Sequence, residues 1–365
     1  MKVLITGGAG FIGSHTADLL SQKGYSVKIL DNLSPPVHDG EWPDYVKREG
    51  YELVRGDVTN KKDLTKVLDS VDYVLHLAAY QDQMPNFSKF FTTNTVSTAL
   101  IFETILENKF PVKKIVYASS QFVYGDGIYK SEDGKEFFPE LRTEEQFKNK
   151  MWDIIDSGGR RAKFISFKEE QKINPINSYG LSKMASEVMG LRLGKTYGIP
   201  FSILRYSIVQ GARQSPRNIY SGALRIFVTQ ALAGKTITVM EDGNQLRDFV
   251  NVENVAEANV LMIEDSKTDF EIYNVGGGKS YKVKDFAEIV KRITKSDSDI
   301  LIDGRYRRTD TRNAVSDISK LENLGWNPSN SPEKSVNDYV NWIKSSKFDI
   351  EEIVKNIERG HKELV

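Results

Sequence analysis

Cysteine is absent from the 365-residue sequence, and histidine occurs only four times. A chain without cysteine forms no disulfide, holds no cysteine-ligated zinc or iron–sulfur cluster and has no cysteine nucleophile. The histidines, which are His15, His38, His76 and His361, lack the spacing typical of metal ligands. The sequence therefore argues against a disulfide-stabilised extracellular fold, and we expect no metal site.

The sequence also lacks an excess of either charge and lacks any long apolar segment. Its 50 Lys and Arg residues balance 50 Asp and Glu residues, whereas proteins that bind nucleic acid usually carry a basic surplus. No apolar run approaches the ~18 residues that cross a bilayer. The first strand-like residues are followed at once by glycines, unlike a signal peptide. We expect a cytoplasmic enzyme with no nucleic-acid partner and no membrane partner.

Short β-branched segments alternate with amphipathic helical patterns through the first half of the chain. This alternation predicts βαβ units and a parallel sheet, and therefore an α/β fold. Helices are expected at residues 13–23, ending at Gly24, and at residues 178–197. The expected strands are Val3–Thr6, Ser26–Asp31, Glu52–Val54, Tyr73–Leu77, Lys114–Ala118, Phe201–Tyr206 and Ile272–Val275.

Two segments break this alternation. In residues 126–172, 21 of the 47 residues are charged, which indicates a surface insertion between a strand and the next helix. The insertion could be a lid, an oligomer contact or an inert surface loop, and the last two are favoured. The expected first domain comprises residues 1–205, and its sheet also takes residues 249–278. Residues 206–248 and 279–365 form a smaller lobe.

Glycines follow the first expected strand and open the first expected helix. Gly8, Gly10 and Gly13 fit the spacing G-x-G-x-x-G, while Gly7, Gly10 and Gly13 fit G-x-x-G-x-x-G. Such glycines let the backbone approach a pyrophosphate, which then rests on the positive N-terminal end of the helix. In this strand–turn–helix context the pattern predicts a dinucleotide site.

Asp31 ends the second expected strand, 18 residues after Gly13. An acidic residue about 20 residues beyond the glycines typically binds the adenosine ribose hydroxyls. Its charge repels a 2′-phosphate, and no arginine follows it closely, so the sequence favours NAD over NADP. Asp57 and Val58, after the third expected strand, are expected to flank the adenine.

Tyr179 and Lys183 lie four residues apart in an expected helix, which places them on one face. A tyrosine with its usual pKa of ~10 is a poor base at neutral pH. A neighbouring ammonium and a cationic nicotinamide are expected to lower that pKa. Ser119 and Ser120 end the fifth expected strand, at the edge where parallel sheets bind ligands. The four residues form a candidate Ser–Tyr–Lys catalytic set.

With this set, the sequence resembles the extended short-chain dehydrogenase/reductase superfamily, and within it the NAD-dependent nucleotide-sugar epimerase/dehydratase family. The matching motifs follow the family's order through most of the chain. They are Thr6–Gly13, Leu30–Asn32, Gly56–Val58, His76–Ala79, Tyr117–Gly125, Asn177–Lys183, Leu204–Tyr206 and Arg247–Val250. The resemblance implies a Rossmann domain, a doubly wound parallel sheet that holds NAD. It also implies a smaller C-terminal α/β lobe for a nucleotide-diphosphate sugar, and a homodimer.

The resemblance also assigns roles to individual residues. Ser120 and Tyr179 would act on the sugar hydroxyl, and Lys183 on the nicotinamide ribose. The implied substrate contacts are Ser119, Ser120, Gln121, Arg247 and Arg307, with Asp310 and Arg312 as further candidates near the diphosphate. The implied cofactor contacts are Gly7, Gly10, Phe11, Ile12, Gly13, Asp31, Asn32, Asp57, Val58, Leu77, Ala78, Ala79, Asn94, Tyr179, Lys183 and Tyr206.

One position separates the reaction types of the family. Its dehydratases and decarboxylases carry a glutamate before the Val/Leu-Tyr-Gly motif, where this chain has Phe122. Phenylalanine cannot transfer protons, so the resemblance implies a 4-epimerase for a UDP- or dTDP-hexose. Such an enzyme oxidises C4 transiently to a 4-keto sugar and returns the hydride to its opposite face. The alternatives are a C2-epimerase, a reductase or dehydrogenase of nucleotide sugars, or a non-catalytic NAD-binding scaffold.

Three features depart from the family pattern, all near the substrate side. Ser207 and Ile208 replace a common Phe-Asn pair, the segment Tyr80–Pro85 differs from that of galactose epimerases, and the insertion separates Ser120 from Tyr179. The sequence therefore leaves the hexose and the nucleotide base open. A C-terminal helix over residues 350–364 is expected to dock on its own domain, because its apolar residues share one face.

Overall fold

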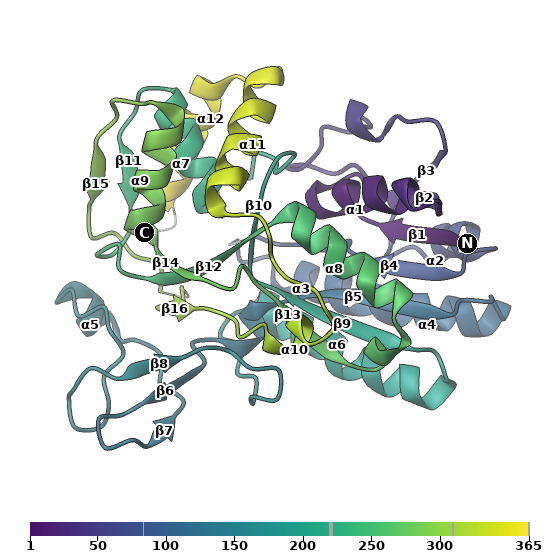
Figure 1. The fold of residues 1–365 in the computed structure, drawn as a ribbon, viewed down its shortest axis with the longest axis horizontal. Coiled ribbons are helices and arrows are strands. Elements are labelled where there is room, and N and C mark those ends of the chain that lie inside the picture. Colours follow the sequence, from purple (N-terminus) through teal and green to yellow (C-terminus); the bar gives the residue numbers. More distant parts are fainter. Residues whose placement is uncertain (83, 219–221, 309, 364–365) are drawn as a thin grey trace.

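A parallel sheet of seven strands forms the centre of the molecule (Figure 1). The computed structural model describes residues 1–82, 84–218, 222–308 and 310–363. The strands are β1 (Lys2–Thr6), β2 (Ser26–Asp31), β3 (Tyr51–Arg55), β4 (Tyr73–His76), β5 (Lys114–Ser120), β9 (Phe201–Tyr206) and β13 (Ile272–Val275). Their order is β13-β9-β5-β4-β1-β2-β3, and every neighbouring pair is parallel. The α/β fold class expected from the sequence is confirmed.

Helices cover both faces of this sheet (Figure 1). One face packs against α1 (Phe11–Gln22) and α8 (Val252–Glu264), the other against α2 (Lys61–Leu68), α4 (Ser97–Asn108) and α6 (Ser178–Tyr197). Because both faces are buried, central strands such as β5 are covered along their whole length. The helix α6 begins after the N-cap Asn177 and ends at Gly198, which has a φ of +69°. These are the bounds that the sequence predicts.

The strand order reverses between β1 and β4. From β1 the chain continues outward through β2 and β3, whereas β4, β5, β9 and β13 lie on the other side. In open α/β sheets a crevice for ligands forms at such a reversal, outside the carboxyl ends of the strands. The glycine turn after β1, residues 77–79 after β4 and Ser119 and Ser120 at the end of β5 all lie at this edge.

Residues after β9 build a smaller lobe with its own core. One sheet contains β10 (Ile208–Gln210), β12 (Leu246–Asn251), β14 (Ser280–Lys282) and β16 (Asn313–Ala314), and a second pairs β11 (Ile237–Val239) with β15 (Ile300–Ile302). The helices are α7 (Ala223–Leu232), α9 (Val283–Thr294), α11 (Pro332–Ser345) and α12 (Ile350–Glu363). Residues 249–278 were expected with the large sheet. Within them, β13 is a strand of that sheet and α8 packs on it, whereas residues 249–251 end β12 in the small sheet.

The C-terminal helix α12 docks on its own lobe, as expected. Ile353, Val354 and Ile357 are buried, and Ile350 packs against the core of the lobe. The helix lies against α7. Leu364, the last residue of the expected helix, lies outside the described residues.

The charged insertion folds into a small antiparallel sheet at the lower left of Figure 1. Its elements are β6 (Ile128–Lys130), β7 (Glu136–Phe137), α5 (Glu144–Lys148) and β8 (Lys163–Ile165), with strand order β7-β6-β8. Ion pairs with almost no solvent exposure join it to the smaller lobe, among them Arg142 with Glu241. The insertion is therefore a folded element packed on the lobe and not a free surface loop. Its role as an oligomer contact stays a prediction.

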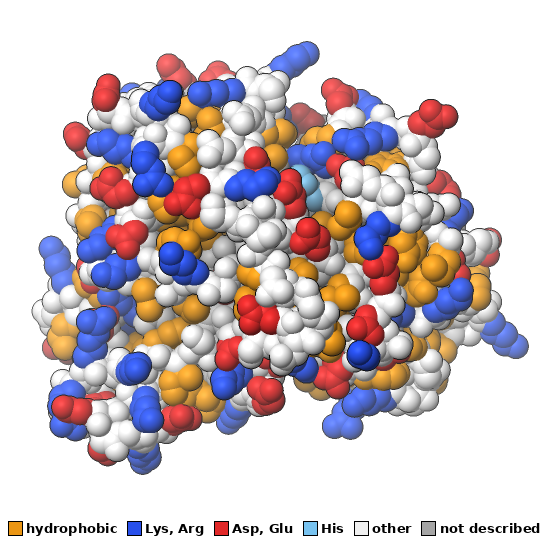
Figure 2. Space-filling view, viewed as in Figure 1, with side chains coloured by type: hydrophobic (Ala, Val, Ile, Leu, Met, Phe, Trp, Pro, Cys, Tyr) orange, Lys and Arg blue, Asp and Glu red, His pale blue; other side chains and the backbone are white. Residues whose placement is uncertain are grey.

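Short elements complete the described chain: α3 (Phe87–Phe90), the π-helical segment Phe91–Val96, α10 (Ser319–Glu322) and the 3-10 turns Asp44–Val46, Gln121–Tyr124 and Ser266–Thr268. Figure 2 shows acidic and basic side chains interspersed over the face in view, in keeping with the balanced charge. Within the described part of the chain, no helix combines the length and apolar character that crossing a bilayer requires.

Candidate active site

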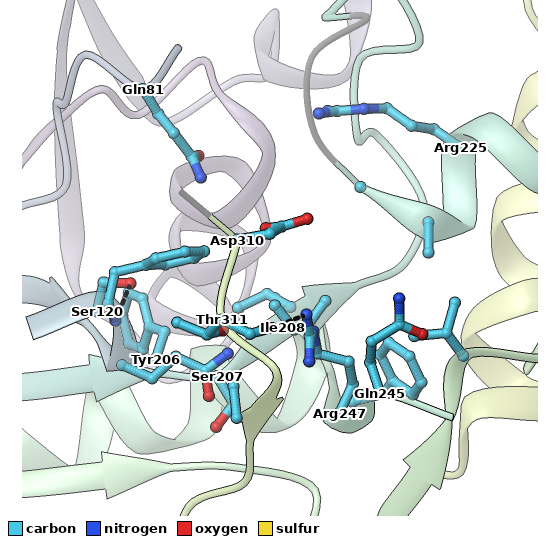
Figure 3. A pocket seen from close by; sticks show the side chains of 18 of the residues that line it. Gln81, Ser120, Tyr206, Ser207, Ile208, Arg225, Gln245, Arg247, Asp310 and Thr311 are labelled. Carbon is cyan, nitrogen blue, oxygen red and sulfur yellow. Dashed lines mark hydrogen bonds between the residues drawn. The ribbon is translucent and has the colours of Figure 1, made fainter. Parts of the chain in front are cut away.

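A cavity of about 310 Å³ lies between the carboxyl edge of the large sheet and the smaller lobe. Phe11 of α1 and Tyr179 of α6 line it beside the large sheet. Figure 3 shows Ser120 of that sheet with Arg247 and Thr311 of the lobe. The cavity therefore joins the expected Ser–Tyr–Lys set to the expected diphosphate-binding arginines.

The turn between β1 and α1 fits a dinucleotide. Gly7 has a φ of +69°, and a Cβ atom there would lie 2.8 Å from backbone atoms of Ala78, so only glycine lets this turn pass close to the end of β4. Gly10 is the N-cap of α1 and has no side chain to occupy the first N–H groups of the helix. Those groups and the helix dipole suit a pyrophosphate. Phe11, Ile12 and Gly13 continue the turn into the helix.

Carboxylates lie at the ends of β2 and β3, beside this turn. Asp31 accepts hydrogen bonds from the backbone N–H groups of Ala9 at 3.1 Å and Leu33 at 2.9 Å, which ties β2 to the glycine turn. Burial raises the pKa of Asp31, while these N–H groups oppose that rise. Asn32 donates to Asp57 at 2.9 Å, next to the buried Val58. The set fits the adenosine half of NAD.

Sequence reasoning missed His38, which lies near this carboxylate. The imidazole is 8% exposed, and its Nε2 atom has no hydrogen-bond partner in the described part of the chain. Burial lowers the pKa of His38, although the charge of Asp31 raises it. No spacing in the sequence signals this approach, because the loop after β2 creates it.

The helix α6 carries Tyr179 and Lys183 past the end of β5. A Cβ atom on Gly180 would lie 2.5 Å from the carbonyl oxygen of Phe122, so glycine permits this close approach. Tyr179 and Ser120 both line the cavity, and Ser120 is among the groups that affect the pKa of Tyr179. The Ser120 hydroxyl accepts a hydrogen bond from the backbone N–H of Phe122 at 3.3 Å. The Nζ atom of Lys183 donates to the carbonyl oxygen of Ala118 at 2.6 Å. The three proposed catalytic side chains are thus held together at the edge of the sheet.

Burial controls the protonation of these groups. It raises the pKa of Tyr179 to about 12, although the Ser120 hydroxyl lowers it. Burial also lowers the pKa of Lys183 to about 7, against the raising effect of Glu187. The sequence-based expectation joins Lys183 to the cationic nicotinamide, and the protein's own groups alone raise the pKa of Tyr179. The lowering that a base requires is therefore left to bound NAD.

The neighbours of Ser120 have different partners. The hydroxyl of Ser119 donates to Glu187 at 2.5 Å, beneath the cavity. Gln121 is 2% exposed and lines the cavity, and neither of its amide atoms has a partner among the described residues. Gln121 can therefore still bind a ligand through both amide atoms, whereas the Ser119 hydroxyl is occupied.

Asn94 and Tyr206 support the site from two sides. Asn94 accepts from the backbone N–H of Tyr80 at 2.8 Å and donates to Ser182 at 2.9 Å. It therefore joins the segment after β4 to α6. Tyr206 lines the cavity, and its hydroxyl donates to Asn259 at 2.6 Å. The polar groups of Asn94 and Tyr206 thus have partners within the protein. Leu77, Ala78 and Ala79 follow β4 beside the glycine turn.

Three arginines line the cavity on the side of the lobe. Arg247 donates to the carbonyl oxygens of Thr311 at 2.8 Å and Arg312 at 3.1 Å. The Nε atom of Arg307 has no partner in the described part of the chain. Sequence reasoning missed Arg225, which is 6% exposed and whose pKa burial lowers to about 10. A single charged residue within the apolar helix α7 was the available signal.

Arg312 was expected beside the diphosphate, and this expectation is wrong. Its guanidinium is bound in ion pairs with Glu241 at 2.8 Å and Asp242 at 2.7 Å. Its side chain is 1% exposed. Guanidinium groups bind diphosphates through paired N–H donors, and this one is already committed to carboxylates.

Known proteins resemble the chain along most of its length. It matches the NAD dependent epimerase/dehydratase family over residues 3–147 and 158–276. It is 30% identical over 348 residues to the dTDP-L-rhamnose 4-epimerase of Burkholderia thailandensis, with 94% of each chain covered. It is 27% identical over 365 residues to the UDP-glucose 4-epimerase of Halalkalibacterium halodurans, covering 94% of this chain and 96% of the relative.

The fold is likewise similar to solved structures. The UDP-glucose 4-epimerase of Thermotoga maritima, solved with UDP-glucose, matches with a TM-score of 0.74 and 27% identity. The match covers 94% of this chain and 99% of that structure. The glycine turn and the carboxylate of Asp31 fit the cofactor that the family name states. The chain therefore belongs to the NAD dependent epimerase/dehydratase family, and NAD is its cofactor.

Proposed function

We propose that the protein is a 4-epimerase of nucleotide-diphosphate hexoses with UDP or dTDP as the nucleotide. One observation carries this proposal: Ser120 and Tyr179 meet at the cavity with Phe122 beside them. The Phe122 and Tyr179 rings lie 6.0 Å apart, edge to face. An apolar ring at this position offers no acid for dehydration or decarboxylation, while the serine, tyrosine and lysine suffice for reversible oxidation of a hydroxyl.

The residues divide this reaction between them. Ser120 orients the C4 hydroxyl of the sugar, and Tyr179 accepts its proton and later returns it. Lys183, held by Ala118 at 2.6 Å, lies where its charge can bind the nicotinamide ribose. The glycine turn and Asp31 would hold NAD, which would supply the reversible hydride transfer at C4 of the sugar, with return to its other face. The three arginines hold the diphosphate while the keto sugar turns about that link.

The charges along the cavity support a neutral hexose. Among the described lining residues, the cations are Arg225, Arg247 and Arg307, and Figure 3 shows Arg225 and Arg247 on the far side from Ser120. Ser120 is followed in the chain by Gln121 and Phe122, and Gln81, Ser207 and Ile208 also line the cavity, all of them uncharged. A sugar carboxylate placed there would lose its hydration without gaining a cation, so amides that bind hydroxyl groups favour an uncharged sugar.

Gln245 supports a pyrimidine base at the other end of the cavity. Its Nε2 atom donates to the carbonyl oxygen of Met240 at 3.0 Å, and its Oε1 atom has no partner in the described part of the chain. The side chain lines the cavity with Ile226 and Phe249. An unpaired acceptor between apolar side chains suits the N3–H group of uracil or thymine.

The proposal includes a homodimer. Several large apolar side chains are exposed on α6, α4 and the π-helical segment before α4. They are Phe91, Val96, Leu106, Leu181 and Val188. Exposed apolar groups gathered on neighbouring helices are typical of a protein interface. Light scattering of the purified protein should give twice the mass of 41.3 kDa, and a monomer would contradict this part of the proposal.

Proton NMR of the purified protein without added cofactor tests the function. UDP-glucose, UDP-galactose and dTDP-glucose are offered in turn, and the absorbance of reduced nicotinamide is recorded at the same time. We expect interconversion of the C4 isomers with no net reduction of the cofactor. Stoichiometric reduced cofactor would instead identify a dehydrogenase, and NAD binding without any turnover of sugars would favour a scaffold.

A further inference from the structure

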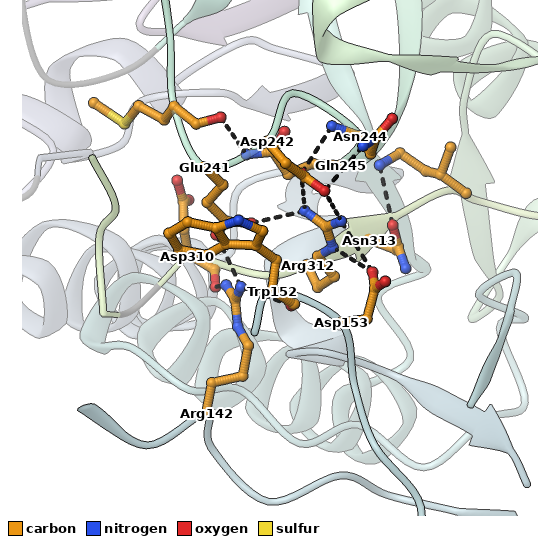
Figure 4. A network of polar contacts seen from close by, with 12 residues as sticks. Arg142, Trp152, Asp153, Glu241, Asp242, Asn244, Gln245, Asp310, Arg312 and Asn313 are labelled. Carbon is orange, nitrogen blue, oxygen red and sulfur yellow. Dashed lines mark hydrogen bonds and ion pairs between the residues drawn. The ribbon is translucent and has the colours of Figure 1, made fainter. Parts of the chain in front are cut away.

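Arg142 of the insertion is buried against the smaller lobe (Figure 4). Its Nη1 atom lies 2.9 Å from the Glu241 carboxylate, and the two side chains are 2% and 3% exposed. The same guanidinium donates to the carbonyl oxygens of Trp152 at 3.1 Å and Asp310 at 2.9 Å. One side chain therefore joins the insertion, the turn after β11 and a segment that lines the cavity.

Arg312 makes a second set of contacts between the same parts. Its guanidinium pairs with Asp153 of the insertion at 2.9 Å, as well as with Glu241 and Asp242. Its backbone N–H donates to the carboxylate of Asp126 at 2.9 Å, at the start of the insertion. The start of the insertion, through Asp126, and its middle, through Arg142, thus hold the backbone at residues 310–312.

Aromatic rings extend this contact to the residue before Arg307. The ring of Phe147, on α5, stacks on Tyr306 with a centroid distance of 4.4 Å and an interplanar angle of 1°. Trp152 lies 6.2 Å from the same tyrosine ring, and the guanidinium of Arg142 lies 4.6 Å from the centre of Phe147. The insertion therefore covers the outer side of residues 305–308 and 310–312.

The inner side of that segment faces the cavity. Arg307, Asp310 and Thr311 line it, and the carbonyl oxygen of Thr311 also accepts from Arg247. The buried contacts of Arg142 lie directly behind these lining residues. Arg307 belongs to this segment, and Arg247 is bound to its Thr311 carbonyl. The insertion therefore helps to position both of these arginines.

We infer that residues 126–172 form a clamp that positions residues 305–308 and 310–312 for nucleotide-diphosphate binding, with Arg142 as its central positioning residue. The inference rests on the proposed function for the chemical class of the ligand. Buried ion pairs contribute little net stability, because desolvation offsets their attraction, but they can favour one conformation over others. Arginines that must meet a diphosphate bind it best when their geometry is fixed before the ligand arrives.

Calorimetric binding of UDP and of dTDP to the purified enzyme tests the clamp. We expect Arg142→Met to weaken binding of the preferred nucleotide at least tenfold, while the NAD content of the enzyme stays unchanged. The nucleotide affinity of Arg142→Lys should lie between those of Arg142→Met and the unmodified enzyme. Its ammonium keeps the charge near Glu241 but cannot donate to both carbonyl oxygens. Turnover, where present, should show a raised KM with kcat within about threefold.

The matched control is Arg160→Met, which removes an exposed arginine that pairs with Glu132 within the insertion. This variant should bind both nucleotides as the unmodified protein does. Phe147→Leu removes the ring that stacks on Tyr306 and lies against Arg142 but keeps the ion pairs. It should weaken binding in the same direction, which keeps the test open if Arg142→Met does not fold.

Four results have separate meanings. Equal nucleotide affinity in folded Arg142→Met and in the unmodified protein would overturn the clamp. Equal losses in Arg142→Met and Arg160→Met would also overturn it, because they would indicate a general effect of the insertion. Weakened UDP or dTDP binding without any epimerase activity would support the clamp and contradict the proposed reaction. An unmodified protein that binds neither nucleotide would overturn both.

Discussion

The hydroxyl of Ser119 donates a hydrogen bond to Glu187 at 2.5 Å, and Glu187 pairs with Arg205 at 2.7 Å beneath the cavity. The hydroxyl of Ser120, the next residue of β5, accepts from the backbone N–H of Phe122 at 3.3 Å and lines the cavity with Tyr179. Successive side chains of a strand point to opposite faces, so the two serines have different partners. We therefore assign Ser119 to the support of the sheet edge and Ser120 to the reacting sugar.

Glu187→Gln should destabilise the fold. The side chains of Glu187 and Arg205 are 2% and 3% exposed, and removing one partner of a buried pair leaves the other charge uncompensated. We expect the free energy of unfolding to fall by about 3 kcal/mol, measured by urea denaturation. Glu264→Gln breaks an exposed pair with Lys23 and should cost less than about 1 kcal/mol. Equal small losses in both variants would contradict the importance of burial.

Tyr179→Phe should retain NAD and lose turnover. The substitution removes the proton acceptor while keeping the ring that packs beside Phe122. We expect the turnover rate to fall by several orders of magnitude and the bound NAD, measured after denaturation, to remain as in the unmodified protein. Tyr197→Phe, at the exposed end of the same helix, is the control. Near-full activity of Tyr179→Phe would remove this residue as the base.

Local sequence patterns predict much of the part of the site that fits the cofactor. The strands β1 to β5 and β9 follow from short apolar runs, and the placement of Tyr179 and Lys183 on one helix face follows from their spacing. By contrast, Glu187, which accepts from the Ser119 hydroxyl, lies far from Ser119 in the sequence. The carboxylates that pair with Arg312 are likewise distant from it in the sequence. Such pairings arise only when separate elements pack together, so no local pattern could indicate them.

Lys183→Met should change how stability depends on pH. Burial lowers the pKa of Lys183 to about 7 from its ordinary 10.5. Between these values the unfolded chain holds a proton that the folded protein does not, so the stability of the unmodified protein rises with pH in this window. The stability of Lys183→Met relative to the unmodified protein should therefore fall, by about 2 kcal/mol between pH 7 and 9.

Urea denaturation of cofactor-free protein at pH 6, 7.5 and 9 measures this difference. The control is Lys195→Met, an exposed residue near the end of α6, for which the difference should not change with pH. A constant difference for Lys183→Met as well would show that Lys183 titrates close to its ordinary pKa in the folded protein.

Asp31→Asn should narrow the preference for NAD over NADP. Asparagine keeps one oxygen for the N–H groups of Ala9 and Leu33 but removes the charge that repels a 2′-phosphate. Hydrogen bonds to charged groups contribute about 1.5–3 kcal/mol, so we expect NAD affinity to fall about tenfold or more while NADP affinity rises. Reconstitution with each cofactor measures the ratio, with the exposed Asp44→Asn as the control. An unchanged ratio would contradict the role of Asp31.

The most direct test of the account follows a deuterium atom at C4 of the sugar nucleotide that the protein converts. If Ser120, Tyr179 and Lys183 oxidise and re-reduce that carbon with resident NAD, the product isomer keeps the deuterium at C4. No hydrogen from solvent then enters at this carbon. Mass spectrometry and proton NMR of the product in ordinary water measure this retention. Complete retention is the predicted result, whereas loss of the C4 deuterium to solvent would contradict the account.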